Sequence, residues 1–305
     1  MSLHSLQLAA LTQSQLETWA VQAQLQAQDG QLPNYIPLLA QADANWFAVQ
    51  VQNRDGQIHS AGNLSLSFPL MSAIKPFVLL FLLEHLGVAT VFKHVGVEPS
   101  EEPFNSLRQL QADQGWPRNP MINSGAIALA SLLPGQDARS CCQGLCQWLN
   151  EYANCHLFLD EQMLSSVRSV PNERNQAIAL LLTQSGYLAE TAPDTYNHVC
   201  CLSGTVADLA SIGMLLVQSQ SVQPAHRRIV NALMMTCGLY QASGSFAVHI
   251  GLPTKSGVSG VIVSVVPLQG AIACYSPTLD ESGHSKAGLF LLQQLTQTLD
   301  LSVFG

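Results

Sequence analysis

The sequence predicts an α+β fold, in which helices pack on an antiparallel sheet and a helical region separates two groups of strands. Strand signals are confined to an early stretch, 46–62, and a late stretch, 245–276. Between them, apolar residues recur with helical spacing from about 98 to 216. We therefore expect a five-stranded sheet domain built from residues 1–97 and 217–305, flanked by helices, with 98–216 inserted as an all-helical domain.

The first third of the chain contains signals for a helix, a hairpin and a second helix. Apolar residues at near-helical spacing over 11–28 predict an amphipathic helix. The segments 46–52 and 57–62 alternate as strands do, and the Asp-Gly dipeptide between them is a hairpin signal. The segment 72–86 is apolar nearly all round, which predicts a helix buried in the middle of the fold.

The remaining elements follow from the same two periodicities. Helical spacing predicts four helices, over 121–133, 142–152, 172–184 and 206–218. Three late segments are predicted as strands: 245–251, 260–266 and 271–276. Leucines spaced from Leu289 to Leu299 predict a closing amphipathic helix.

Composition argues against several kinds of partner and location. The net charge is -8, charged residues make up only 10% and there is no basic run, which disfavours nucleic acid and anionic membrane. We expect no signal peptide and no membrane span, because neither a charged N-terminal leader pattern nor an apolar run of about 18 residues is visible. The eight cysteines form no C-x-x-C pair, which favours reduced buried thiols and a cytoplasmic location over disulfides or metal.

The most informative chemical signal is Ser72 followed by Lys75, which form an S-x-x-K pattern at the start of the apolar helix. Residues three apart share a helix face, so the lysine amine can lie beside the serine hydroxyl and take its proton. Burial would lower the lysine pKa and help it act as a base. The alternative is a helix start with Ser72 near the cap and a solvated lysine.

Four polar residues farther along the chain are weaker candidates. Asn123 begins an apolar helix and could bind a carboxylate or amide, or act as an N-cap. Asn175 fits a solvated helix face, and Tyr196 is expected in a loop as a half-buried packing residue. Tyr240 lies in a glycine-bounded turn and could pass protons, or could be an ordinary turn residue.

The segment Lys255-Ser256-Gly257 strengthens the first signal. It is close to the Lys-Thr-Gly sequence that accompanies S-x-x-K in serine acyl-transfer enzymes, and it precedes a predicted strand. Such an edge can direct a backbone N–H at a developing oxyanion. The two motifs together favour acyl-enzyme chemistry.

At this point the chain resembles the serine-dependent glutaminases, which have a β-lactamase-like fold related to that of the penicillin-binding proteins. The similar segments run in family order from about residue 30 to 290. They are Tyr35-Ile36-Pro37, Ser72-Ala73-Ile74-Lys75, Glu98-Pro99-Ser100, Pro103-Phe104-Asn105, Asn119-Pro120-Met121-Ile122-Asn123, Arg174-Asn175-Gln176-Ala177, Tyr196, the 238–244 and 251–258 segments, and Ser276-Pro277-Thr278-Leu279-Asp280.

The resemblance implies the role of each matching residue. Ser72 would be the nucleophile, Lys75 would activate it and Tyr240 would pass protons. Backbone N–H groups of Ser72 and Val258 would form the oxyanion hole. The residues implied in holding the substrate amino acid are Tyr35, Asn123, Asn175 and Tyr196. The resemblance implies L-glutamine or a related amide as substrate, no metal or organic cofactor, and a homodimer or homotetramer.

Two positions depart from the family pattern. Arg168 stands where the family has a glutamate that faces the substrate ammonium, and the residue before it is Val167. An arginine cannot accept a hydrogen bond and would repel an ammonium, so Glu173 or another acid would have to substitute. Pro76 replaces an aliphatic residue beside Lys75, which is harmless only in the first turn of a helix.

Three functions therefore remain open. The first is hydrolysis of L-glutamine to L-glutamate and ammonia through a Ser72 acyl-enzyme. The second, prompted by Arg168, is a serine amidase of the same fold with an altered substrate. The third is a catalytically weak relative that binds a metabolite or partner. A penicillin-binding or β-lactamase role fits the segments less well.

Overall fold

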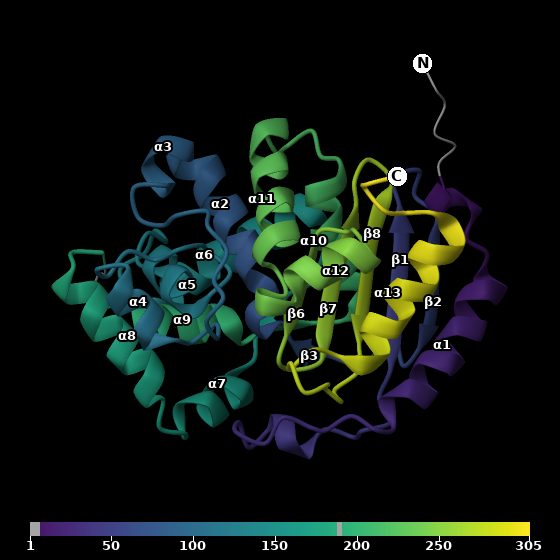
Figure 1. Cartoon of the computed structure of the whole chain (residues 1–305), viewed down its shortest axis with the longest axis horizontal. Coiled ribbons are helices and arrows are strands. Elements are labelled where there is room, and N and C mark those ends of the chain that lie inside the picture. Colours follow the sequence, from purple (N-terminus) through teal and green to yellow (C-terminus); the bar gives the residue numbers. More distant parts are fainter. Residues whose placement is uncertain (1–6, 188–190) are drawn as a thin grey trace.

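The computed structural model describes residues 7–187 and 191–305. It contains the expected five-stranded antiparallel sheet, with strand order β2-β1-β8-β7-β6 (Figure 1). These strands are β1 (Ala48–Asn53), β2 (Ile58–Gly62), β6 (Thr254–Gly257), β7 (Val261–Val266) and β8 (Gly270–Tyr275). The early hairpin joins the late strands through β1 and β8, which pair from Ala48↔Tyr275 to Asn53↔Gly270.

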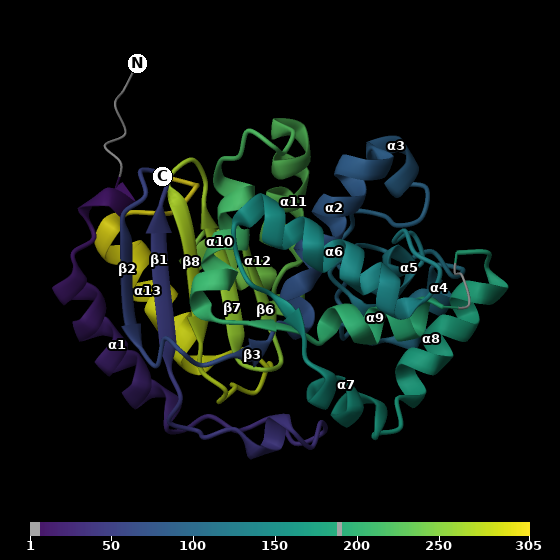
Figure 2. The same ribbon diagram turned by 180° about the vertical axis from the view of Figure 1, so that it is seen from behind.

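Both faces of the sheet are covered, and successive side chains alternate between them. On one face Val49, Ile262 and Ile272 pack with helices α1 (Gln13–Ala27) and α13 (Lys286–Leu299); in Figure 1, α13 lies in front of the sheet and α1 lies beside its β2 edge. On the other face Val263 and Ala273 pack with apolar residues of α2, α6, α10 and α11. Figure 2 shows this second face, with α10 crossing the sheet.

The helical part of the chain lies at the end of the sheet nearest β6 (Figures 1 and 2). The remaining helices are α2 (Lys75–Leu86), α3 (Val88–Val91), α4 (Leu107–Ala112), α5 (Asn123–Ala130), α6 (Ala138–Ala153), α7 (Glu161–Arg168), α8 (Glu173–Gln184), α9 (Ala192–Cys200), α10 (Val206–Val217), α11 (Pro224–Cys237) and α12 (Ser243–His249). Three short strands form a second sheet: β3 (Phe68–Pro69), β4 (Phe158–Leu159) and β5 (Leu202–Gly204). The 3₁₀ turns are Gln7–Ala10, Leu39–Gln41, Met71–Ile74 and Tyr240–Ala242. The division into domains at 98 and 216 stays a prediction.

Two predicted elements are wrong. The segment 245–251, expected as a strand, lies mostly in helix α12, and the third late strand is instead β6. The alternation there did not reflect burial, because Val248 is 82% exposed. Tyr196 was expected in a loop but lies in helix α9, whose Pro193 occupies the first turn, where proline is tolerated.

Two other expectations can be compared with the structure. All eight cysteines are unpaired, and seven of them are buried, as expected for reduced thiols. Within 7–187 and 191–305, no helix combines the length and the apolar character that crossing a membrane requires.

Candidate active site

Ser72 and Lys75 lie on the two sides of a change of helix type. Ser72 lies in the 3₁₀ turn Met71–Ile74, and Lys75 is the first residue of α2, so the α-helix begins three residues later than predicted. A 3₁₀ turn has three residues per turn, which aligns side chains three apart. The turn begins with a left-handed residue, Met71, at φ 47°. Its approach is fixed by a bond from Leu70 N to Leu202 O of 2.8 Å.

Pro76 does not disturb this arrangement. It is the second residue of α2, within the first turn, where a backbone N–H has no helical partner to lose. The fixed φ of proline suits this position. The departure from the family pattern at Pro76 is therefore compatible with the placement of Lys75.

Lys75 is buried, with only 2% of its surface exposed. Its Nζ donates to Met121 O at 3.0 Å and to Asn123 Oδ1 at 2.9 Å, two uncharged oxygens. Burial lowers the pKa of Lys75 to about 8, and the nearby Cys200 thiol opposes this only in part. Much of the amine is consequently neutral near pH 8 and able to accept a proton.

Asn123 links the lysine to the helical wall of the site. Its Oδ1 also accepts from the Tyr196 hydroxyl at 3.1 Å, and its Nδ2 donates to Asn175 Oδ1 at 2.9 Å. The side chain makes no capping bond, because Ile122 is the N-cap of α5. The N-cap alternative for Asn123 is therefore wrong, and the residue joins helices α2, α5, α8 and α9 through side-chain bonds.

A cavity of about 350 Å³ opens between this network and Ser72. Six of the residues singled out from the sequence line it: Tyr35, Ser72, Asn123, Asn175, Tyr196 and Val258. The others are Ile36, Met71, Phe104, Asn105, Val167, Asn172, Arg174, Asn197 and Cys200. Among the described lining residues, none is acidic and one, Arg174, is a cation.

Arg168 points away from the cavity lining. Its guanidinium makes a bidentate pair with Asp194, with Nη2 at 2.7 Å from both carboxylate oxygens, and both side chains are about half exposed. Its neighbour Val167 lines the cavity instead. Glu173 is exposed and is not part of the described lining, so it does not replace the family's glutamate there.

Tyr240 lies on the opposite side of Ser72, in a strained turn. Its φ is 55°, a left-handed conformation that costs free energy in any residue with a side chain. Its ring stacks on Phe104 at a centroid distance of 4.8 Å, and Lys255 Nζ lies 4.3 Å from its ring centroid. Burial raises the pKa of the Tyr240 phenol well above its usual value, although a hydrogen bond with Ser72 opposes the shift. The phenol thus stays protonated at neutral pH.

The close approach of β6 to the turn that holds Ser72 depends on a glycine. A Cβ added to Gly257 would lie 2.5 Å from Leu70 O, so only glycine lets the end of β6 approach the turn that holds Ser72. Val258 follows directly and lines the cavity. Ser259 fixes the same approach by donating to Pro69 O at 2.7 Å. Lys255 is fully buried and donates to Ser256 O at 2.8 Å, and burial lowers its pKa.

Cys200 is a cavity residue that the sequence analysis missed. It lies four residues after Tyr196, on the same face of helix α9, and interacts with the Tyr196 hydroxyl. Burial raises the pKa of its thiol to about 11, which keeps it neutral. The i, i+4 spacing would have found it had α9 been predicted as a helix.

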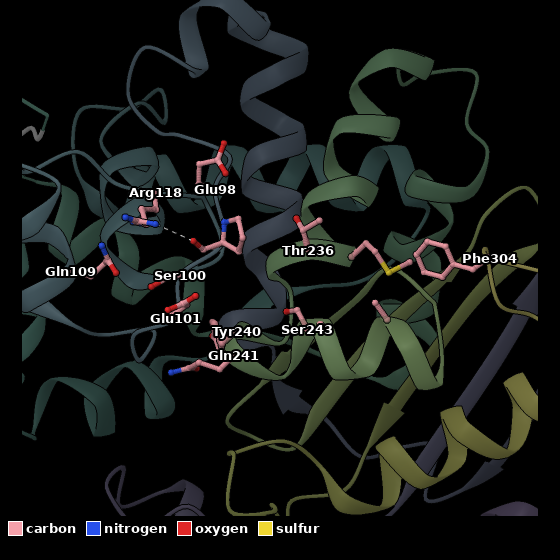
Figure 3. Close-up of a pocket in the computed structure, with 14 residues that line it drawn as sticks. Glu98, Ser100, Glu101, Gln109, Arg118, Thr236, Tyr240, Gln241, Ser243 and Phe304 are labelled. Atoms are coloured by element: carbon pink, nitrogen blue, oxygen red, sulfur yellow. Dashed lines mark hydrogen bonds between the residues drawn. The ribbon is translucent and has the colours of Figure 1, made fainter.

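A second, larger cavity of about 900 Å³ lies beyond Tyr240 (Figure 3). Glu98, Glu101 and Arg118 line it, together with Tyr240 itself. Because Phe104 lines the smaller cavity and stacks on Tyr240, this aromatic pair lies between the two cavities. Tyr240 therefore borders the second cavity as well.

Comparison with known proteins identifies the family of the chain. The glutaminase family model matches residues 30–304. A glutaminase from Synechocystis is 45% identical over 293 residues, which cover 94% of this chain and 90% of that protein. A Bacillus subtilis glutaminase, solved as a covalent complex with 5-oxo-L-norleucine, is similar with a TM-score of 0.85 and 31% identity, covering 95% and 99% of the two chains.

A third similar protein, Mglu, was solved in its glutamate form, with a TM-score of 0.89 and 29% identity over 96% of this chain and 69% of its own. The family match spans most of the chain, and the solved relatives share its sheet and helical arrangement. The chain belongs to the glutaminase family and is an amidohydrolase.

Proposed function

We propose that the protein hydrolyses the side-chain amide of L-glutamine to L-glutamate and ammonia through an ester on Ser72. The observation that carries this proposal is the bonded network from buried Lys75 through Asn123 to Tyr196 and Asn175, beside the cavity that Ser72 lines. The glutamate bound by Mglu and the covalent complex of the Bacillus subtilis glutaminase support the same substrate class and a covalent adduct.

In the first half of the reaction, Ser72 Oγ attacks the amide carbon of the substrate. Neutral Lys75 takes the hydroxyl proton, which its pKa of about 8 permits. The negative oxygen of the tetrahedral intermediate accepts hydrogen bonds from the backbone N–H groups of Ser72 and Val258. The proton is then passed to the amide nitrogen, the carbon–nitrogen bond breaks and ammonia leaves.

In the second half, water attacks the ester and gives up a proton as glutamate is released. Tyr240 serves in both halves as a neutral phenol, which can accept a proton on its oxygen while donating its own. Its raised pKa and its bond with Ser72 support this role over that of a phenolate. The Ser72 oxygen receives the last proton, which restores its hydroxyl. Overall, one water is consumed and one ammonia is released.

The amino-acid end of the substrate is held, in this proposal, by Tyr35, Asn123, Asn175 and Tyr196. Their amides and phenols can bind both a carboxylate and an ammonium. Arg168 is engaged with Asp194, so it does not repel the ammonium from within the cavity. The absence of an acid from the described lining favours one variant of the function: acceptance of amides that lack the ammonium.

Two substrates distinguish a glutaminase from an amidase that accepts amides without an ammonium: L-glutamine, and glutaramic acid, which has the same amide without the amine. Ammonia release is measured from each. Release from glutamine that disappears in Ser72→Ala is the expected result. Release mainly from glutaramic acid would establish an amidase with altered specificity. Release from neither substrate, by a folded protein, would contradict the proposal and favour a binding role.

Two further features of the protein remain proposals. We expect a homodimer or homotetramer, as the family resemblance implies, which sedimentation analysis would check. We also expect a cytoplasmic location, which the unpaired cysteines support.

A further inference from the structure

A buried histidine lies behind Tyr240 and is not used by the mechanism above. His284 is 2% exposed and belongs to the turn between β8 and α13. Its backbone is fixed on both sides by Asp280, since His284 N donates to Asp280 Oδ1 at 2.9 Å and Asp280 N donates to His284 O at 2.8 Å. The turn therefore presents the imidazole in one orientation.

The imidazole connects two parts of the site. Its Nδ1 lies 2.8 Å from Ser256 Oγ, on the strand that ends at the oxyanion position. The ring also interacts with the backbone of Leu239, the residue before Tyr240. The two aromatic rings of His284 and Tyr240 lie 6.2 Å apart and are inclined by only 23°.

The Leu239–Tyr240 turn needs such support because it is strained. Tyr240 adopts a left-handed conformation, which persists only where its surroundings enforce it. On the N–H side, Leu239 donates to the buried Ser243 hydroxyl at 3.0 Å. The His284 ring lies against the same turn, since it stacks with the Tyr240 ring and lines a groove together with Leu239. Tyr240 and Ser243 can be followed in Figure 3, on the turn that leads into α12.

The protonation state of the ring decides whether it can make both contacts. Accepting from Ser256 at Nδ1 while donating toward Leu239 requires the neutral ring. The charged or titratable groups around it are Lys255 on β6, Asp280 in its own turn, Tyr240, and His249 and Lys286 in the adjoining groove. Burial and Lys255 lower the pKa of His284 to about 4, which keeps the ring neutral at physiological pH.

We propose that His284 is a positioning residue for Tyr240: its neutral ring joins Ser256 to the Leu239 backbone and holds the strained turn where the Tyr240 phenol meets Ser72. This role rests on the proposed function, since it acts through the proton transfers assigned to Tyr240. Loss of His284 should therefore lower kcat and leave substrate affinity nearly unchanged, because neither His284 nor Tyr240 is among the residues that line the substrate cavity.

Three variants separate this role from a general structural one. His284→Phe keeps the ring shape but removes both polar contacts, and we expect kcat to fall at least tenfold with KM changed less than twofold. His284→Asn keeps an acceptor and a donor, and we expect it to recover most of the activity. His249→Asn is the matched control, because this exposed histidine lines the same groove but bonds within its own helix; it should leave kcat and KM unchanged.

A double-mutant cycle with Tyr240→Phe gives the decisive readout. If His284 acts through Tyr240, adding His284→Phe to the Tyr240→Phe enzyme should lower its residual kcat by less than twofold. An equal tenfold loss in both backgrounds, or full activity in His284→Phe alone, would overturn the proposal. If His284→Phe does not fold, the smaller His284→Ala replaces it in the double-mutant cycle. Failure of the proposed function would look different, as full activity in Tyr240→Phe itself.

Discussion

The two walls of the active site hold their residues in different ways. On the wall nearest the sheet, Lys255 is a buried amine with a lowered pKa, and Tyr240 lies in a left-handed turn. On the helical wall, Asn123, Asn175 and Tyr196 are neutral and bond to one another. Under the proposed roles, catalysis depends on groups held away from their ordinary state, and substrate binding depends on groups that bond to each other. Lys75, like Lys255, has a lowered pKa, but it bonds to Asn123 on the helical wall.

The largest effect should come from the base that joins the two walls. Lys75→Arg keeps a cation that cannot lose its proton, so we expect kcat to fall by about 10³-fold, within the range for lost general base catalysis. In the unaltered enzyme, kcat/KM should rise with pH through about 8, because the neutral amine is the active form. A pH–rate profile checks this. A profile that is flat between pH 6 and 9 would contradict the assignment of Lys75.

Substitutions on the helical wall should change KM more than kcat. Asn175→Ala removes one partner of the amide network, and we expect KM for glutamine to rise about 10-fold, the effect of losing roughly one hydrogen bond to the substrate, with kcat nearly unchanged. The control is Asn45→Ala, at an exposed asparagine that bonds to Asp43. A fall in kcat as large as the rise in KM would show that the two walls are not separable.

The sheet wall should also make stability depend on pH. His284 has a folded pKa of about 4, below its ordinary value of 6.5, so the unfolded chain binds more protons between these values. Stability from this group is complete above pH 6.5 and is lost as pH falls toward 4, by about 3 kcal/mol in all. Urea denaturation of the protein and of His284→Asn at several pH values should give a shallower pH dependence for the variant. Equal slopes would mean that another group titrates.

The smallest effect should come from the pair outside the cavity. Arg168→Ala removes an exposed ion pair with Asp194, so we expect less than a twofold change in kcat/KM for glutamine and at most about 1 kcal/mol in stability. The matched control is Arg139→Ala, which removes a comparably exposed pair with Glu161. A large change in kcat/KM for Arg168→Ala alone would mean that Arg168 contacts the substrate and belongs to the helical wall of the site.

The sequence was informative where a pattern is local. The pattern of Ser72 and Lys75 predicted the start of a buried helix, and apolar Val and Ile runs located β7 and β8, which are buried on both faces. It was misleading over α12, where apolar alternation has no burial behind it. The orientation of Arg168 could not be predicted, because it depends on Asp194, which another helix brings alongside. His284 gave no signal, since its contacts with Ser256 and Leu239 come from distant segments.

The position of β1 inside the sheet, between β2 and β8, has a consequence for synthesis on the ribosome. This strand pairs with β8 across more than 200 residues of intervening chain. At a translation rate of about 5–20 residues per second, the early hairpin waits on the order of 10 to 40 s for its partner to emerge. During that time the edge of β1 that will meet β8 is an unpaired, apolar template for other chains. The five-stranded sheet can therefore assemble only late in synthesis. Slow synthesis would prolong the exposure of the early hairpin, and truncated synthesis would leave it without its partner strand and prone to aggregation.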